Sequence, residues 1–342
     1  MRPEYSLIIL TVLAGAGQGL FIFLVTGDMA GFAKGSRAPQ SAVLLGMAAV
    51  FGLTLLGMAA SFFHLSHKAR GIKAINKWRF SWLSREVVLL PVFLGAAGLY
   101  ALAGLMGSHP LLIQTLGVGG ALVALALFVS TAMIYGHLQI IREWGTAFTP
   151  ANFTLTGMIT GGLALLAVYG QAMAPMGVTL FIMRILFAVT AAGLLVKLFY
   201  YLGNAHKYSP TTIQTALGIN HPQIRLMDTG AAYPHYNTLE YFYTGQKEIR
   251  GIMRIASILL LYIAPGGLIA VDYMSLLSAG TACGVCAPLA ALSALAGAFL
   301  ERWLFFVDGN HAQNLYYGVY PAQGRANPIL QAGKNDAPLP PA

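Results

Sequence analysis

Charged residues are scarce in this sequence, and their scarcity limits the class of protein. Only 9% of the 342 residues are Asp, Glu, Lys or Arg, whereas soluble domains usually carry about 25%. Hydrophobic residues make up 57% of the chain, and the mean hydropathy is +0.68. The 39 glycines follow no Gly-X-Y period. This composition excludes a soluble enzyme, a disordered chain and a collagen-like fibre, and it indicates a membrane-embedded protein.

Cysteine is almost absent, which limits the metal chemistry available to the chain. The sequence has two cysteines, Cys283 and Cys286, within an apolar stretch. An iron–sulfur cluster generally takes four protein ligands, so two thiols are too few. Their CxxC spacing lies at the start of an expected membrane helix, where packing thiols or a local disulfide are favoured over a metal. We therefore predict no metal site in this chain.

Alternation of polar and apolar residues is also missing, which argues against a membrane β-barrel. The apolar runs are instead continuous and reach about 20 residues, the length of a membrane-spanning helix. No cleavage site follows the first run, so we expect it to be retained. The fold class expected is an all-α integral membrane protein, a bundle of eight transmembrane helices. The expected spans are Tyr5–Thr26, Ser41–Phe63, Val87–Met106, Leu111–His137, Phe153–Met173, Val178–Leu202, Gly251–Tyr273 and Thr281–Phe306.

The basic residues are distributed unequally between the two sides of this expected bundle. An even number of spans puts both termini on one side, which we call the first face. It receives 17 of the 20 Lys and Arg, whereas the opposite face has only Lys34 and Arg37. By the positive-inside rule the first face is cytoplasmic, in a bacterial inner membrane. The net charge of +9 is explained by this asymmetry, so we expect no nucleic-acid partner. Residues 1–308 form the expected membrane domain, and residues 309–342 form a cytoplasmic, partly disordered tail.

Two ionisable residues lie at the first face, one at each end of the same loop. His64 follows the second span, and Glu86 precedes the third. Ionisable groups at membrane depth are costly and favour a functional hypothesis. A histidine that titrates near neutral pH, beside a carboxyl group, suits proton exchange with a quinone. The alternatives are that His64 lies in the headgroup layer, and that Glu86 is favoured by the helix macrodipole, with Ser84 as N-cap.

The residues around this loop resemble a known family. The stretch from Ser61 through His64 and Arg70, and the run Asn76-Lys-Trp-Arg-Phe-Ser-Trp-Leu-Ser-Arg-Glu86, are similar to the anchor subunit of DMSO reductase-type molybdoenzymes, the DmsC family. The run Glu301-Arg-Trp-Leu-Phe305 and the run Asn314-Leu-Tyr-Tyr317 resemble the sulfite-oxidising, sulfite dehydrogenase branch. The resemblance extends to about residue 310 and is densest between 60 and 90.

The resemblance implies an eight-helix, quinone-binding subunit of a three-subunit oxidoreductase. It implies a molybdenum bis-pterin catalytic subunit and an iron–sulfur subunit as partners, with those cofactors outside this chain. It assigns His64 and Glu86 to the quinone site, where ubiquinone or menaquinone would be reduced with electrons from cytoplasmic sulfite. A quinol-oxidising anchor of a DMSO or polysulfide reductase is the alternative in the same family. A secondary transporter, which broken helices and a charged midplane site would mark, is the alternative from another class.

Other residues of the 64–86 loop receive secondary roles. Arg70 and Trp82 are candidates for contact with the quinone, although an interfacial Trp is more often a belt anchor. Basic side chains are candidates for docking the iron–sulfur partner through an acidic surface. They are Lys68, Lys73, Lys77 and Arg79.

Several further polar residues have no role that the sequence can assign. His137 ends the fourth span and could pair with His64 at a haem, but no second His pair lies toward the other face, so haem is disfavoured. Arg184 falls inside the sixth span and needs a partner there. Asp28 and Asp272 fall near the opposite boundary, where we expect water to reach them.

Overall fold

The computed structural model describes residues 4–35, 38–61, 72–171, 174–205, 213–221, 224 and 247–317. Across these residues the secondary structure is helical apart from one isolated β-bridge, between Ile141 and His311. The long helices are α1 (Tyr5–Lys34), α2 (Gln40–Ser61), α4 (Trp82–Leu105), α5 (Pro110–Gly136), α6 (Phe148–Gln171), α7 (Met176–Ala205), α10 (Lys247–Ile258), α11 (Ala264–Ala279) and α12 (Cys286–Asp308). Short elements are the 3-10 helices η1 (Ile72–Lys77) and η3 (Ala312–Tyr317), the helix α8 (Ile213–Leu217) and the π-helical segment η2 (Leu259–Ile263).

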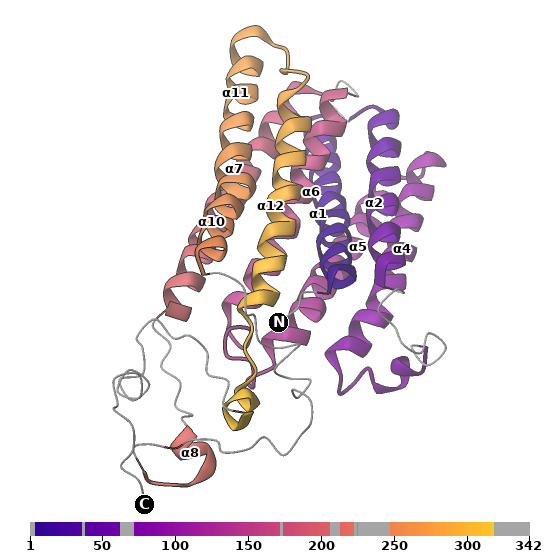
Figure 1. Ribbon diagram of the computed structural model, residues 1–342. Helices are drawn as coiled ribbons and strands as arrows, with labels where there is room; N and C mark the ends of the chain where they lie inside the picture. The colour runs from indigo at the N-terminus through magenta and orange to yellow at the C-terminus, as the bar shows by residue number, and fades with distance from the viewer. Residues whose placement is uncertain are drawn as a thin grey trace, which may run out of the picture.

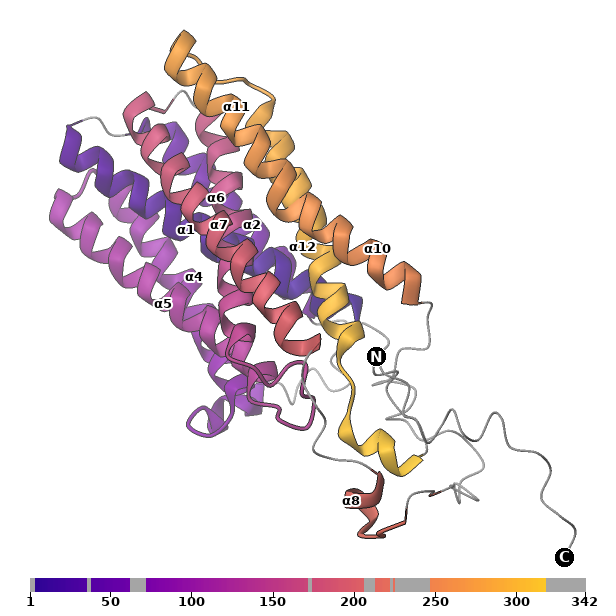
Figure 2. The same ribbon diagram turned by 90° about the vertical axis from the view of Figure 1, so that its left-hand side faces the viewer.

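Eight helical segments in the described residues are long and apolar enough to cross a membrane, which confirms the predicted all-α bundle. The seventh is continuous from α10 through η2 to α11. Figure 1 shows the segments running roughly parallel to one another, with α1 beginning and α12 ending at the same end of the bundle. That end is the first face. The loop 137–147 and the segment 72–81 lie at the same end (Figures 1 and 2).

Five predicted boundaries were wrong by five residues or more. The fifth span begins at Phe148 rather than Phe153, and the seventh continues past Tyr273 to Ala279. The first span continues past Thr26 to Lys34, because Asp28 is buried within the bundle and accepts a hydrogen bond from Tyr100 Oη at 3.0 Å. The third begins at Trp82, five residues early, because Ser81 supplies the N-cap. The eighth begins at Cys286, because the preceding residues form a turn.

Helix α1 is the centre of the bundle. Of its most apolar 18-residue stretch, 78% is buried inside the protein, whereas the corresponding share for α4 is 22%. It packs against α2, α5, α6 and α12, while α4 packs against α5 and α2, and α10 and α11 lie against α12 on the far side (Figure 2). Because lipid offers helices no hydrophobic driving force to associate, close van der Waals contact has to hold them together.

Glycines at the α1–α6 contact make that close approach possible. A Cβ atom on Gly161 of α6 would overlap the backbone of Gly19 and Leu20 in α1, and a Cβ on Gly19 would overlap the carbonyl of Gly157. The backbones of α1 and α6 therefore touch directly. Small residues at such crossings are the usual means of packing helices in membranes.

The seventh span contains a local irregularity next to proline. The π-helical segment η2 ends at Ile263, and Pro265 follows within the first turn of α11. Proline has no backbone N–H to donate to the preceding turn, so the hydrogen-bond ladder has to rearrange there. Pro91 lies inside α4, whereas Pro288 lies in the first turn of α12, where proline is tolerated.

The α1–α6 contact gives a stability prediction. Gly161→Ala places a methyl group against the backbone of α1, and overpacking of this kind typically costs about 1–3 kcal/mol. We expect a lower free energy of unfolding in denaturant titrations of the purified protein in mixed micelles. Gly119→Ala is the matched control, because a Cβ there meets nothing within 4 Å, and its effect should stay within about 0.5 kcal/mol. Equal effects of the two substitutions would contradict the close α1–α6 packing.

Candidate functional site

Glu86 lies one turn inside α4, not at its N-terminus. The N-cap is Ser81, whose hydroxyl accepts the N–H of Ser84 at 3.4 Å, so the prediction that Ser84 is the cap was wrong. Glu86 is the fifth residue of the helix, beyond the first turn in which the macrodipole acts strongly. Its carboxyl group accepts a hydrogen bond from Thr131 Oγ1 of α5 at 2.7 Å. Glu86 is therefore held toward the neighbouring helix by a specific polar contact.

A small cavity lies beside Glu86, between five helices. Its volume is about 20 Å³, which is room for about one water molecule. Its wall is polar on several sides, with Glu86 and Thr131 together with Gln18, Thr156, Thr160 and Arg302. Three buried polar atoms of this wall, Gln18 Oε1, Thr156 Oγ1 and Arg302 Nη1, have no hydrogen-bond partner. The cavity thus joins a carboxyl group to unsatisfied polar atoms inside the membrane domain, but it is too small for a quinone ring.

Part of the predicted quinone site lies outside the described residues. His64, Lys68 and Arg70 belong to this part, so their relation to Glu86 stays a prediction. Trp82 is described, and it is half-buried at the start of α4. The Arg85 guanidinium stacks 4.0 Å from the centre of the Trp82 ring and donates to the carbonyls of Trp78 and Arg79 at 3.0 and 2.9 Å.

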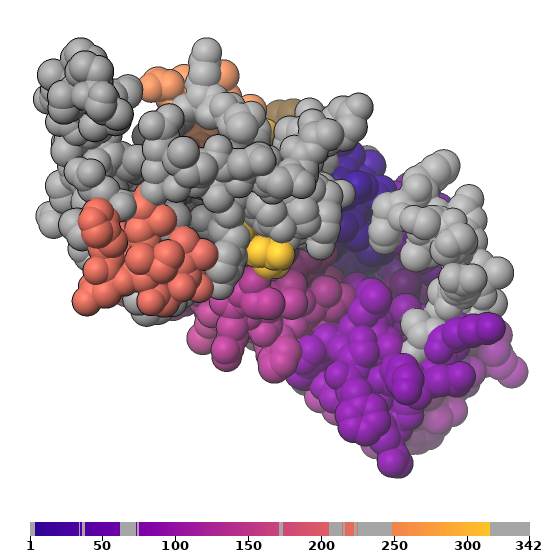
Figure 3. Space-filling model, turned by 60° about the horizontal axis from the view of Figure 1, so that its bottom comes forward, coloured from indigo at the N-terminus to yellow at the C-terminus, as the bar shows by residue number. Residues whose placement is uncertain are grey.

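The segment 72–81 presents an exposed surface that is both basic and aromatic. Lys73, Lys77 and Arg79 are exposed, as expected for docking residues. Two aromatic side chains lie among them, with Phe80 88% and Trp78 53% exposed. Figure 3 shows this segment in purple at the first face, with the magenta surface of the α5–α6 loop next to it. Large exposed aromatics beside cations are typical of contact surfaces for other proteins.

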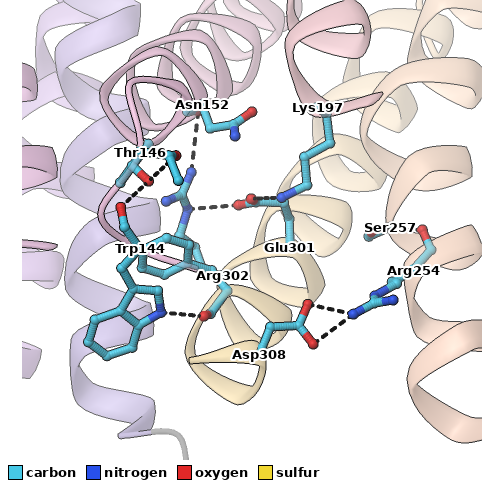
Figure 4. Close-up of polar contacts among 11 residues, drawn as sticks. Trp144, Thr146, Asn152, Lys197, Arg254, Ser257, Glu301, Arg302 and Asp308 are labelled. Carbon is cyan, nitrogen blue, oxygen red and sulfur yellow. Dashed lines mark hydrogen bonds and ion pairs between the residues drawn. The ribbon is translucent and has the colours of Figure 1, made fainter. Parts of the chain in front are cut away.

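The sequence reasoning missed a cluster of charged residues in the bundle. Lys197 of α7 and Glu301 of α12 form an ion pair at 2.5 Å, with both side chains 1% exposed. Arg302 Nε lies 2.8 Å from the other oxygen of Glu301, and Arg302 Nη2 donates to the Asn152 carbonyl of α6 at 3.3 Å. Figure 4 shows Arg302 between Asn152 and Glu301, with Lys197 on the other side of the carboxylate. We call Lys197, Glu301 and Arg302 the buried charge cluster.

This cluster corrects the position that the sequence indicated for two basic residues. Lys197 and Arg302 were counted as first-face charges, but they are buried and paired. The signal was available, since both fall inside the expected spans Val178–Leu202 and Thr281–Phe306, where an ionisable residue is a functional candidate by default. Taking them out of the 17 leaves 15 basic residues on the first face against two on the other, so the asymmetry persists.

Polar contacts hold the first-face end of α12 against its neighbours. Asp308, the last residue of the helix, accepts from Arg254 Nη2 at 2.8 and 2.9 Å (Figure 4). Trp144 Nε1 donates to the carbonyl of Phe305 at 2.7 Å. Asn310 N–H donates to Glu143 at 3.3 Å, and burial raises the pKa of the Glu143 carboxyl. These contacts fix α12 against α10 and the α5–α6 loop.

The remaining polar candidates each have a position in the structure. Asp28 and Asp272 are buried rather than wetted, and Asp272 accepts the N–H of Cys283 at 2.6 Å. Arg184 Nε donates to Tyr273 Oη at 3.2 Å, which supplies the partner it needs. His137 is exposed, as the C-cap of α5.

Thiol and metal candidates give no site in the part of the chain that the structure covers. Cys283 and Cys286 are free thiols, so they form no local disulfide. No group of three or more His, Cys, Asp or Glu that could hold a metal ion occurs among the described residues.

The whole membrane domain matches a known family. The family described as DMSO reductase anchor subunit (DmsC) matches residues 1–319. The chain belongs to this family. It is therefore a membrane anchor subunit, and its eight spans agree with an inner-membrane location.

Similar proteins include members of two branches of this family. The C subunit of the sulfite dehydrogenase of Allochromatium vinosum is 34% identical over 330 residues, which cover 93% of this chain and 99% of that protein. The anaerobic dimethyl sulfoxide reductase chain YnfH of Escherichia coli is 28% identical over 149 residues, 43% of this chain and 50% of that protein. An anaerobic dimethyl sulfoxide reductase chain of Haemophilus influenzae is 27% identical over 150 residues, 43% of this chain and 51% of that protein. The similarity to the sulfite dehydrogenase protein is thus full-length, and that to the reductase chains is partial.

The buried charge cluster gives a second prediction. Glu301→Gln leaves two cations without a carboxylate, and breaking a buried ion pair in this way costs about 3–5 kcal/mol. Lys197→Met should cost less, because Glu301 and Arg302 remain as a neutral pair. Denaturant unfolding of the purified protein in mixed micelles measures both.

A matched control exists at the end of α12. Asp308→Asn removes the partner of the half-exposed Arg254, and such pairs contribute about 1 kcal/mol or less. If Glu301→Gln were no more destabilising than Lys197→Met, the charge imbalance inferred for the cluster would be wrong.

Proposed function

We propose that this chain is the membrane anchor of a sulfite-oxidising molybdoenzyme and that it contains the site where the membrane quinone is reduced. The main support for this proposal is the full-length similarity to the sulfite dehydrogenase protein of Allochromatium vinosum, together with the amino-acid sequences of the segments 76–86 and 301–317. Electrons from sulfite would leave a molybdenum centre and pass through iron–sulfur clusters, both held by partner subunits. The quinone is the substrate of this chain and becomes quinol by accepting two electrons and two protons.

Glu86 would act as a proton relay behind the quinone. The cavity beside its carboxyl group admits one water molecule and no ring, so the quinone would lie on the first-face side of Glu86, toward His64. Glu86 would give up a proton toward the quinone and recover one through water. The hydrogen bond from Thr131 Oγ1 holds the carboxyl group in place while its charge changes. His64 would donate a hydrogen bond to the quinone, and Arg70 and Trp82 would bound the site.

The exposed surface of the 72–81 segment would dock the iron–sulfur partner. Lys73, Lys77 and Arg79 would meet acidic groups, and the exposed rings of Trp78 and Phe80 would be covered by the partner. Lys68 would extend the same basic surface. The remaining excess of basic residues on this face supports a cytoplasmic position for the docking surface.

Replacing the proton relay should separate quinone reduction from sulfite oxidation. In the purified complex, Glu86→Gln keeps the side-chain shape but cannot carry a proton, and loss of a positioned acid–base group typically costs about 10²–10⁴-fold in rate. We expect sulfite-dependent quinone reduction to fall by that order, while sulfite oxidation with an artificial electron acceptor is unchanged. His64→Ala should give the same pattern.

Three outcomes distinguish this function from its alternatives. Equal loss of both activities would indicate failed assembly, and unchanged quinone reduction in Glu86→Gln would reject Glu86 as the relay. An outward C-terminus, found with a reporter fused after Ala342, would instead favour a reductase with its catalytic subunits outside the membrane. Glu143→Gln is the matched control, because Glu143, like Glu86, is a partly buried carboxyl toward the first face but lies outside the cavity wall.

A further inference from the structure

The buried charge cluster carries more positive than negative charge. It contains two cations, Lys197 and Arg302, and one carboxylate, Glu301, all nearly inaccessible to solvent. Glu301 is shared, with one oxygen on Lys197 and the other on Arg302. A surplus charge of one unit therefore remains in a region where isolated charges are strongly disfavoured.

The surplus charge faces Glu86 across the small cavity. Arg302 and Glu86 are the two charged residues in the cavity wall. The guanidinium is fixed, because it stacks 3.5 Å from the centre of the Phe153 ring and is bonded to Glu301 and Asn152. Its Nη1 is left without a partner, and so are Gln18 Oε1 and Thr156 Oγ1 on the same wall. An unsatisfied donor, an unsatisfied acceptor and an unsatisfied hydroxyl thus border a space the size of a water molecule.

We propose that one water molecule occupies this cavity and couples Arg302 to Glu86, which makes Arg302 a positioning residue that stabilises the ionised form of the Glu86 carboxyl. The water would accept a hydrogen bond from Arg302 Nη1 and donate one to Gln18 Oε1. Its second hydrogen would be donated to the Glu86 carboxyl group. Three polar partners are typical for a buried water. This inference rests on the proposed function, because it assigns to Arg302 the control of the relay residue.

Among the described residues, other charged groups near Glu86 do not substitute for Arg302. In their described residues, α2 and α6 have no charged residue, and α5 has none either. Lys73 and Lys77 of η1, which packs against α4, are exposed, so water screens their charges. Arg85 is turned away, onto the Trp82 ring and two loop carbonyls. Arg302 is therefore the buried cation that the described surroundings of Glu86 provide.

The test is an infrared pH titration of the purified complex in detergent, without substrate. The carbonyl band lost in Glu86→Gln is assigned to the protonated Glu86 carboxyl. Removing a nearby opposite charge favours the protonated form, so Arg302→Gln should move the titration midpoint of this band upward by about 1–3 pH units. Arg302→Lys, which keeps the charge, should stay near the wild type. Gln18→Leu, which removes one partner of the water and no charge, should give a smaller upward shift.

Control variants and opposite outcomes make the inference falsifiable. Arg254→Gln removes another paired arginine that does not border the cavity, and it should leave the midpoint unchanged. If Arg302→Gln does not fold, the Arg302→Lys and Gln18→Leu variants still test the proposal. An unshifted titration midpoint in Gln18→Leu would overturn the water bridge. A midpoint that moves with chloride concentration would also overturn it, in favour of an anion in the cavity. The titration does not depend on quinone turnover. The coupling of Arg302 to Glu86 can therefore be rejected while Glu86 remains the relay, and it can be supported even if Glu86 proves dispensable for quinone reduction.

Discussion

The ion pair between Lys197 and Glu301 constrains the rest of the site, because hydrocarbon supplies no water to solvate either charge. It connects α7 to α12, and Arg302 extends the connection through the Asn152 carbonyl to α6. Three helices from different parts of the chain are thereby fixed in rotation and depth. The cost of leaving any of these charges unpaired makes the arrangement specific. A rigid set of charges is what the proposed relay at Glu86 needs, since its proton affinity depends on distances that must not change.

Polar groups are distributed in two layers of the bundle, with an apolar layer between them. Glu86, Gln18 and Arg302 lie in the half next to the first face, and Asp28, Tyr100 and Asp272 lie toward the opposite end. Along α1 the residues between Gln18 and Asp28 include Leu20, Phe21, Phe23 and Leu24, all fully buried. Because this layer lacks charged side chains on α1, a proton route from Glu86 along this helix would lead to the first face. Proton uptake at the side where electrons enter would then not move charge across the membrane.

The fold was predictable to a large extent, and the site only partly. Eight apolar runs were enough for the bundle, because membrane helices must satisfy their backbone hydrogen bonds internally and their lengths match the bilayer. The boundaries at Thr26 and Val87 were wrong because a buried Asp28 and a capping Ser81 depend on tertiary and local contacts that hydropathy does not register. Glu86 became a candidate because it borders a loop, and its role stays a prediction. The charge cluster was missed because charged residues near span ends are ordinarily attributed to the interface, and only the pairing of α7 with α12 shows that these two cations are buried.

The close packing of α1 against α6 and the small polar cavity occur next to each other in the bundle, and together they limit the water near Glu86. Glycines let α1 and α6 touch at Gly19 and Gly161, so that backbone packs directly against backbone with no side chain between them. The space bordered by Gln18, Thr156 and Gly157 lies beside this contact, toward the first face. A tight crossing above a small polar space limits the water near Glu86 to about one molecule. With so little water, the proposed electrostatic effect of Arg302 on Glu86 would be screened much less than at the surface.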